Sequence, residues 1–356
     1  MSWLNINKGN YDFSGYNLKT NLNTLNNSSV TNIIVYDYGN EGSIRDLSRT
    51  FYNFRYIRSV DISNAKTEKV TTTNDMFWNC KNLGTVQNFD TSNVTNMRSM
   101  FSNCNALMNV SNFDTSNVTD MSNMFYGCSK LTTVSSFDTS NVTNMRNMFY
   151  GCNNLTTVPN LDTSNVSDMS YMFQRCKSLT TVPNFNTSNV SDMYNMFSEC
   201  YNLISVSNFD TSNVINARNM FYGCINLTTV PNLDTSNVSD MSGMLSGCSN
   251  LTTVPNYNTS KVTSMSSMFY ACYNLTTVPN FDTSKVTDMS GMFPRCNALS
   301  NASIQNIINM CINSNVSNSY KNLSNANKYS PLCNTKFNNS YYSNRLSELT
   351  AAGWTY

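Results

Sequence analysis

Cysteine is the first residue whose number and spacing suggest chemistry. The chain of 356 residues contains 12 cysteines and no histidine. Cysteines one coil apart in a stack could form disulfides, and a row of thiols could bind zinc. A constant spacing does not match the short C-x2-C pairs of metal sites, so we expect free, buried thiols that fill one repeated packing position. Ten cysteines recur at intervals of 24 residues, at positions 80, 104, 128, 152, 176, 200, 224, 248, 272 and 296.

Aspartate forms a second regular series. Two neighbouring carboxylates could lie near the ~5 Å separation of a retaining glycosidase pair, and calcium between turns is an alternative. A catalytic pair should occur once, whereas this residue recurs, so we expect hydrogen bonds that form turns. Without histidine, the commonest general base and metal ligand is absent, and we expect no enzyme activity, no cofactor and no metal. The series consists of Asp90, Asp114, Asp138, Asp162, Asp210, Asp234 and Asp282.

The charge composition excludes further classes of function. Lysine and arginine number 22, aspartate and glutamate 21, and the net charge is +1. Binding of nucleic acid needs a clustered excess of basic residues, so we expect no nucleic-acid partner. No run approaches the ~20 apolar residues of a membrane span, and the first residues lack the basic start and apolar core of a signal peptide. We therefore expect no membrane insertion and no secretory signal.

The interval of 24 residues identifies a repeat protein. One unit, Leu131 to Cys152, reads LTTVSSFDTSNVTNMRNMFYGC, and this period lies in the leucine-rich-repeat range. Counted from the residue after each cysteine, apolar residues recur at positions 3, 6, 9, 14, 17, 20, 21 and 24. One coil cannot bury enough surface alone, so coils must stack and both ends need caps. We expect about eleven coils over residues 31–299, the first with Phe54 in the cysteine position, between caps at 1–30 and 300–356.

Local signals predict the elements of each coil. The L-T-T-V segment is the best candidate for a short parallel strand, in line with the strand-sized run from Ile33 to Tyr36. The D-T-S-N segment predicts a turn with asparagine in the left-handed region. An Asp, Asn or Ser before M-x-x-M-F predicts an N-cap on a short helical turn. Proline cannot donate to a ladder, so strand pairing should stop at the residue after the valine, which is proline at Pro159, Pro183, Pro231, Pro255 and Pro279.

Two short helices are expected in the C-terminal cap. Ser303 would cap the first, an amphipathic helix whose apolar residues follow helical spacing. The second would end at Gly353, followed by Trp354 and Tyr356 as covers of the last coil. The apolar residues of the two helices are Ile304, Ile307, Ile308 and Cys311, and then Tyr342, Leu346 and Leu349.

The repeats can be compared with one another inside the chain, and this shows where their surface varies. Positions 1, 18, 19 and 22 vary most, and helical spacing would place 18 and 22 on one face. Interfaces are enriched in aromatic residues and arginine, so this face is a candidate interface with a protein. The alternatives are a face that stacks on sugar rings and an ordinary solvated face. Tyr201 and Tyr273 occupy neighbouring positions. The candidate binding residues are Arg98, Tyr126, Arg146, Tyr150, Tyr171, Tyr194, Arg218, Tyr222 and Tyr270.

The segment from Phe113 to Leu131, FDTSNVTDMSNMFYGCSKL, resembles the repeat of the BspA-type leucine-rich-repeat family in its mycoplasma-lipoprotein variant. The resemblance extends from Leu47 to Leu299, and LTAAGWTY is similar to the terminal cap of that family. It implies a leucine-rich-repeat solenoid without catalytic residues. Family members are surface proteins of bacteria that act in adhesion and in binding to proteins or host surfaces, and similar repeats occur in phage tail and receptor-binding proteins.

The expected lack of a signal peptide, a lipobox cysteine and a wall anchor favours the phage alternative. We expect a tail-associated virion component that binds a bacterial surface glycan or protein. The alternatives are a structural virion protein whose caps contact other subunits, and a bacterial cell-surface adhesin.

Overall fold

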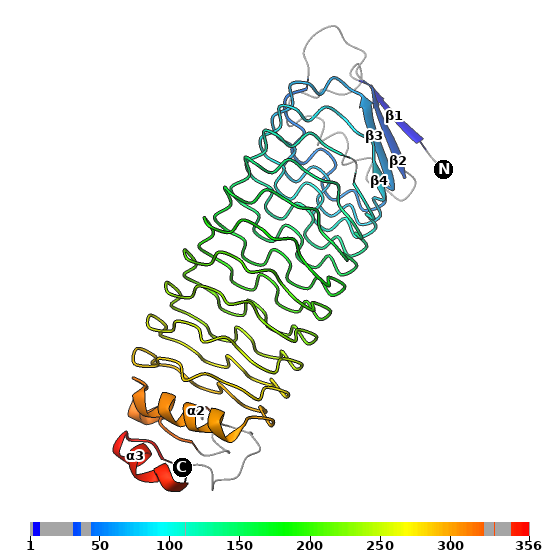
Figure 1. The fold of residues 1–356 in the computed structure, drawn as a ribbon. Helices are drawn as coiled ribbons and strands as arrows, with labels where there is room; N and C mark the ends of the chain where they lie inside the picture. Colours follow the sequence, from blue (N-terminus) through cyan, green and yellow to red (C-terminus); the bar gives the residue numbers. More distant parts are fainter. Residues whose placement is uncertain are drawn as a thin grey trace. The chain divides into compact units, whose positions relative to one another are not determined.

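The computed structural model describes residues 3–7, 31–36, 44–110, 112–323, 331 and 343–355. They divide into two compact units, Met1–Leu179 and Thr180–Tyr356. Within each unit the chain winds into stacked coils (Figure 1). Parallel bridges join equivalent residues 24 positions apart, such as Asn96 to Asp120 in the first unit and Asn216 to Asp240 in the second. The expected repeat solenoid is thereby confirmed.

The first unit contains a parallel sheet with the order β1-β2-β3-β4. The strands are β1 (Trp3–Asn7), β2 (Asn32–Tyr36), β3 (Ser59–Asn64) and β4 (Thr85–Val86). In β2 and β3, β-branched residues at every second position turn inward and are buried, which is the strand period. The strand expected around Ile33 is confirmed. In the expected N-terminal cap, β1 pairs with β2, and the other residues before position 31 lie outside the described part.

The L-T-T-V segments of the regular coils differ from their prediction. Between β4 and residue 300, the described residues contain no further strand, and pairing there is reduced to isolated contacts such as the bridge from Thr253 to Thr277. In the five coils with proline after the valine, a physical reason lies at position 7. There the Gln87 N–H donates to the Val60 carbonyl at 3.0 Å, and proline, which follows this valine in five later coils, has no N–H to donate.

The M-x-x-M-F segment is a run of β-turns, so the predicted helical turn was wrong. The N–H of the fourth residue donates to the carbonyl of the first, from Met124 to Met121 at 3.2 Å and from Cys128 to Phe125 at 3.1 Å. The third residue of each turn has a positive φ, 58° at Asn123 and 72° at Gly127, which type II turns require.

The residue expected to cap a helix instead forms an Asx-turn, in which a side-chain oxygen accepts from the N–H two residues on. At Asp120, for example, Oδ1 accepts from the Ser122 N–H at 2.8 Å.

The coils are joined through the residues between these turn bonds. Every second N–H of the segment closes a turn, and the others point to the carbonyls of the next coil. Few backbone donors of the segment are therefore left without a partner. Four bonds connect the coil that ends at residue 128 to the next one: Met121 N to Asn144 O at 3.2 Å, Asn123 N to Arg146 O at 2.9 Å, Phe125 N to Met148 O at 2.9 Å and Gly127 N to Tyr150 O at 2.6 Å.

The D-T-S-N turn keeps its asparagine in the ordinary backbone region, which corrects a second prediction. None of these asparagines is among the described residues with positive φ. Their amides bind the neighbouring coil instead, as Asn117 Nδ2 does when it donates to the Ser92 carbonyl at 2.7 Å. The left-handed residues lie at positions 19 and 23 of each coil.

The core consists of repeated ladders. Phenylalanine rings at position 21 stack with centroid separations of 5.8 Å between Phe101 and Phe125 and 5.7 Å between Phe125 and Phe149. The eleven cysteines that the structure describes are free and buried. In most coils the thiol donates to a phenylalanine carbonyl, as Cys152 does to Phe125 at 3.2 Å. Phe54 fills the same position with 1% exposure, so the expected packing role of this position is confirmed.

The second unit ends in helical elements. These are α2 (Asn301–Asn313), η1 (Asn318–Tyr320), η3 (Ser343–Arg345) and α3 (Leu346–Ala351). The expected apolar face of α2 is buried, with Ile304, Ile307, Ile308 and Cys311 at 1% exposure or less. Its N-cap is Ser300, and not Ser303. Ser303 is buried, and its hydroxyl has partners there: it donates to the Thr276 carbonyl at 3.0 Å and accepts from the Val278 N–H at 2.9 Å.

The end of α3 follows the sequence pattern. Gly353 has a φ of +83°, as expected for a residue just beyond a helix. Trp354 is 2% exposed, and its indole Nε1 donates to the Cys311 carbonyl of α2 at 2.8 Å. The predictions for Tyr342 and Tyr356 fall outside the described residues.

Candidate recognition surface

The β-turns of each coil determine which side chains face outward. Positions 17, 20, 21 and 24 are buried in nearly every coil, and the pairs 18–19 and 22–23 lie between them. We use the name turn face for the side chains at positions 18, 19, 22 and 23. The sequence predicted that 18 and 22 share a face on helical grounds. The turns give the same result for a different reason, because two turns in succession also repeat every four residues.

The candidate binding residues all lie at turn-face positions, at two levels of exposure. In the first unit Arg98 is exposed, and in the second Arg218, Tyr222 and Tyr270 are exposed. The half-buried candidates are Tyr126, Arg146, Tyr150 and Tyr171 in the first unit and Tyr194 in the second.

Three side chains form a stack across adjacent coils of the first unit. The rings of Tyr126 and Tyr150 are parallel, with centroids 4.5 Å apart and an interplanar angle of 5°. The Arg175 guanidinium carbon lies 5.8 Å from the centre of the Tyr150 ring. Tyr126 and Arg175 belong to the coils before and after that of Tyr150, so they cover its two faces. Burial, and then the neighbouring Tyr150, raise the pKa of Tyr126.

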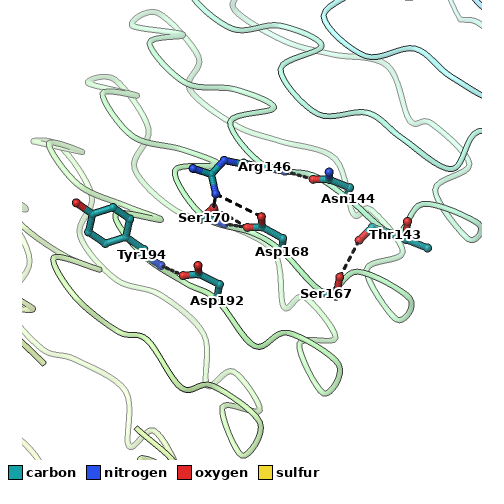
Figure 2. A network of polar contacts seen from close by, with 8 residues as sticks. All are labelled: Thr143, Asn144, Arg146, Ser167, Asp168, Ser170, Asp192 and Tyr194. Carbon is teal, nitrogen blue, oxygen red and sulfur yellow. Dashed lines mark hydrogen bonds and ion pairs between the residues drawn. The ribbon is translucent and has the colours of Figure 1, made fainter. Parts of the chain in front are cut away.

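Arg146 lies in the coil of Tyr150 and links it to the coil of Arg175 through a second group of contacts (Figure 2). Its Nη1 donates to Ser170 Oγ at 2.9 Å and to Asp168 Oδ2 at 3.5 Å. The guanidinium carbon also lies 5.0 Å from the centre of the Tyr171 ring. Arg146 and Tyr150 are four residues apart and contact Tyr171 and Arg175, which are also four residues apart. Two cation–π pairs therefore stand side by side on the turn face.

A further group on this face was missed from the sequence. The rings of Tyr52 and Trp78 stack with centroids 4.6 Å apart. The Arg49 guanidinium carbon lies 5.6 Å from the Tyr52 ring centre, and Arg49 Nε donates to Asp75 at 3.0 Å. The step from Phe54 to Cys80 is 26 residues, so residues of these two coils do not align with the others when positions are counted forward. Counting positions backward from Phe54 and Cys80 would have found Tyr52 and Trp78.

The second unit has its own contacts on and beside the turn face. Arg295 lies 5.8 Å from the Tyr270 ring centre, and a hydrogen bond to Tyr273 raises the pKa of Arg295. The Tyr201 hydroxyl lies 3.2 Å from Glu199 Oε2. Arg295, like Arg175, occupies position 23, which most coils fill with glycine or asparagine. A large side chain where the backbone favours glycine was the signal that could have identified both residues.

The aspartate series at position 10 forms turns, as the sequence predicted. Asp138 Oδ1 accepts from the Ser140 N–H at 3.0 Å and from the Ser140 hydroxyl at 2.7 Å. These two bonds, the hydroxyl first, lower the pKa of Asp138, and serine two residues on lowers the pKa of Asp162 in the same way. Over the described part of the chain, no group of three or more Cys, Asp or Glu side chains could hold a metal ion.

This series predicts loss of stability in acid. A carboxyl group whose pKa is lower in the folded than in the unfolded chain stabilises the fold above its unfolded pKa, and that contribution is lost as the pH falls through the folded pKa. We expect the urea midpoint of unfolding to stay level from pH 7 to about pH 5 and to fall below about pH 4. In the double variant Ser140→Ala/Ser164→Ala the fall should be shallower. An equal acid dependence in both proteins would contradict the role given to the serines.

The 24-residue period, the inward ladders and the parallel bridges between coils define a leucine-rich-repeat solenoid. The chain belongs to the family described as "Mycoplasma protein of unknown function, DUF285", whose model matches residues 45–158, 130–230, 153–251 and 224–335. The resemblance to mycoplasma-type repeats is thereby confirmed. Among curated proteins, a search found no match.

Several solved bacterial structures are similar to this chain. A leucine-rich cell surface protein from Faecalibacterium prausnitzii A2-165 is 20% identical, with a TM-score of 0.40 over 76% of this chain and 82% of that one. A leucine-rich repeat protein from Eubacterium ventriosum is 16% identical, with a TM-score of 0.37 over 70% and 85%. The leucine-rich repeat protein of T. pallidum is 16% identical, with a TM-score of 0.33 over 55% and 77%. Along the described residues, no helix is long and apolar enough to span a membrane.

Proposed function

We propose that this protein is a non-enzymatic recognition protein of a bacterial cell surface, and that it binds its partner through the turn face. The observation that carries the proposal is the contrast between a uniform core and a varied outer surface. The ladders of leucine, valine, methionine, phenylalanine and cysteine repeat in coil after coil, while the turn face changes between serine, arginine, tyrosine, tryptophan and glutamine. Such a fold supports many different surfaces on one scaffold.

The turn face also has the chemistry of an interface. Tyrosine, tryptophan and arginine dominate binding energy in protein contacts, and here they are fixed in advance by contacts with one another. Tyr126 and Tyr150 stack, and Arg146 is bound to Ser170 and Asp168. Less rotational freedom is lost when such side chains meet a partner.

The origin of the protein is proposed as cellular. The matching family is described for Mycoplasma, a bacterium, and the similar structures reported above include a bacterial cell surface protein. None of these comparisons supports the tail-associated virion component that the sequence favoured, so we propose the second alternative, a bacterial surface adhesin.

Binding to intact cells tests the proposal. We expect the labelled full-length chain to bind bacterial or host cells, and the triple variant Tyr126→Ala/Arg146→Ala/Tyr150→Ala to bind at least tenfold more weakly, because truncated interface anchors cost well over 1 kcal/mol. The matched control is Thr133→Ala/Thr157→Ala, which changes two exposed residues of the L-T-T-V segments, one in the coil of Arg146 and Tyr150 and one in the next coil. Equal binding by the triple variant and the control would contradict the assignment of the turn face.

A further inference from the structure

The turn segment of the last regular coil, residues 273–296, lacks part of the neighbour that earlier coils have. In the second unit, the N–H groups at positions 17, 19 and 21 of the earlier coils donate to carbonyls of the next coil, as Met265 does to Asp288 at 2.9 Å. In the last coil, Met289 and Gly291 occupy positions 17 and 19. Within the described part of the chain, neither N–H group has a hydrogen-bond acceptor.

The residues that carry these two donors are not at the open surface. Met289 is 2% exposed, and Gly291 is buried as well. Buried backbone N–H groups in proteins are almost always paired with the chain, with water or with a ligand, because leaving one unpaired costs free energy. Met289 and Gly291 therefore mark a place where a ligand can gain hydrogen bonds without displacing any within the chain.

The chain beyond α2 follows the course of a further coil at two points. Asn315 donates to the Val286 carbonyl at 3.0 Å, and the Pro331 carbonyl accepts from the Phe293 N–H at 2.7 Å. Pro331 thus stands where position 20 of a further coil would lie. Between these two points the described chain forms η1. Among the described residues, none takes positions 16 to 19 of a further coil, whose carbonyls would accept from the two free N–H groups.

A cavity of about 310 Å³ lies at this place. Its walls include residues 287–290 of the last coil together with Val316, Tyr320, Pro331 and Trp354. Cavities that bind ligands begin at about 300 Å³. This cavity is therefore large enough to hold a ligand beside the unpaired donors.

The chemistry of the walls selects the kind of acceptor. Among the described residues that line the cavity, Asp288 alone carries a charge, and its Oδ1 accepts from the Ser290 N–H at 2.9 Å. A carboxylate repels an anion at this distance, so the acceptor for the two N–H groups is neutral. Val316 and Trp354 add an apolar wall, at 6% and 2% exposure.

The earlier coils show which neutral acceptor fits. Their donors at positions 17 and 19 meet two backbone carbonyls, at positions 16 and 18 of the next coil. The side chain between these carbonyls, at position 17, is a buried methionine in most coils, such as Met265. A peptide that joins an open edge offers the same carbonyls and can place an apolar side chain between them.

We propose that the cavity beside Met289 and Gly291 binds a short uncharged segment of a partner protein, which completes the hydrogen bonds of the last coil. Two carbonyls of the segment, two residues apart, accept from these N–H groups, and the apolar side chain between them enters the cavity. The inference goes beyond the proposed function, because this site shares no residue with Tyr126, Arg146 and Tyr150.

A capped peptide tests the proposal with the full chain. Its sequence, VTSMSSMFY, copies residues 262–270, which supply such carbonyls to the preceding coil, and it carries no charge. We expect saturable binding of one peptide per chain by isothermal titration calorimetry. The control peptide VTSDSSMFY should bind about tenfold more weakly, because its first methionine is replaced by a charge that would have to be buried. Equal binding of the two peptides, or no binding of either, would overturn the proposal.

Hydrogen exchange locates the bound peptide. In the free protein, the amides of Met289 and Gly291 should exchange about tenfold faster than those of Met265 and Ser267, which are bonded to the next coil. The peptide VTSMSSMFY should slow exchange at Met289 and Gly291 and leave the other two amides unchanged. Binding that protects other segments and not these two amides would show that the peptide binds elsewhere, and the proposed site would be wrong.

Ser290→Arg provides a second test, because it should fill the cavity. Side chains at position 18 reach the following coil, as Arg146 reaches Ser170 at 2.9 Å, so this variant should bind VTSMSSMFY about tenfold more weakly. The matched control is Ser242→Arg, the same change two coils earlier, which should bind like the unchanged protein. Equal binding by the two variants would contradict the proposal, and so would competition of acetate with the peptide, which would indicate an anion site.

Discussion

Replacing Phe149 with alanine is expected to lower the free energy of unfolding by about 3–5 kcal/mol, the usual cost of removing a fully buried aromatic side chain. Phe149 is fully buried, and its ring stacks between Phe125 and Phe173 at centroid separations of 5.7 and 5.6 Å. The cavity would lie in the middle of a ladder that backbone bonds hold on both sides, so the neighbouring rings cannot close it. The measurement is the urea midpoint with its slope.

The next residue supplies the matched control. Tyr150 is half-buried on the turn face, and its removal loses ring contacts worth about 0.5–1.5 kcal/mol. Phe149→Ala should therefore destabilise the protein at least twice as much as Tyr150→Ala, while Tyr150→Ala should have the larger effect on binding. Equal losses of stability would show that the two residues are not separated into core and surface.

In the native protein, the eleven described cysteines are expected to be almost inert to a thiol reagent such as DTNB at pH 8. Burial raises the pKa of Cys128, Cys272 and Cys311 from 9.0 to about 12, which lowers the thiolate fraction about a thousandfold. The thiolate is the reactive form, and the side chains of the described cysteines are also closed to the reagent. Unfolding should restore rapid reaction of all of them.

This titration is best made in a Cys333→Ser variant, so that only cysteines with a described position are counted. No reducing agent is present. Eleven thiols should react in denaturant, and almost none should react before the denaturant is added. A count well below eleven in denaturant would mean that some cysteines are oxidised. Fast reaction in the native state would contradict their burial.

The sequence predicted the core because burial repeats with the coil. Leu131, Val142, Met145, Met148 and Phe149 were assigned to the interior from their period alone, and all five are fully buried. Position 6 was also assigned to the interior, but Val134 at this position is half-exposed. The packing role of the cysteine position was predicted from Phe54, which occupies this position in an earlier coil and can replace cysteine only in packing.

The local structure was harder to predict because several conformations share one pattern. Two apolar residues three apart, followed by another, fit a helical turn as well as a run of β-turns. The difference depends on φ at Asn123 and Gly127, and asparagine in D-T-S-N was an equally good candidate for the left-handed region. The hydrogen bonds between coils decide the outcome, and these connect residues that are distant in the sequence.

For the same reason, only part of the candidate surface could be predicted from the sequence. Variation between repeats identified Arg146 and Tyr150, but it gave no sign that these residues contact Tyr171 and Arg175 of the next coil. Arg175 was missed because position 23, which is glycine or asparagine in most coils, was not among the positions that vary most. Spatial pairing of exposed side chains depends on the stacking of coils, which the spacing of apolar residues does not describe.

The hydrogen bonds between coils have a consequence for how such a protein can change over time. Within each unit, a regular coil presents to the next coil the same turn-segment donors that its predecessor presents to it. Removal or duplication of 24 codons within a unit therefore leaves the donors of the turn segment opposite matching acceptors. A lineage could lengthen, shorten or reshuffle this protein one coil at a time and so change its binding surface without having to evolve a new core.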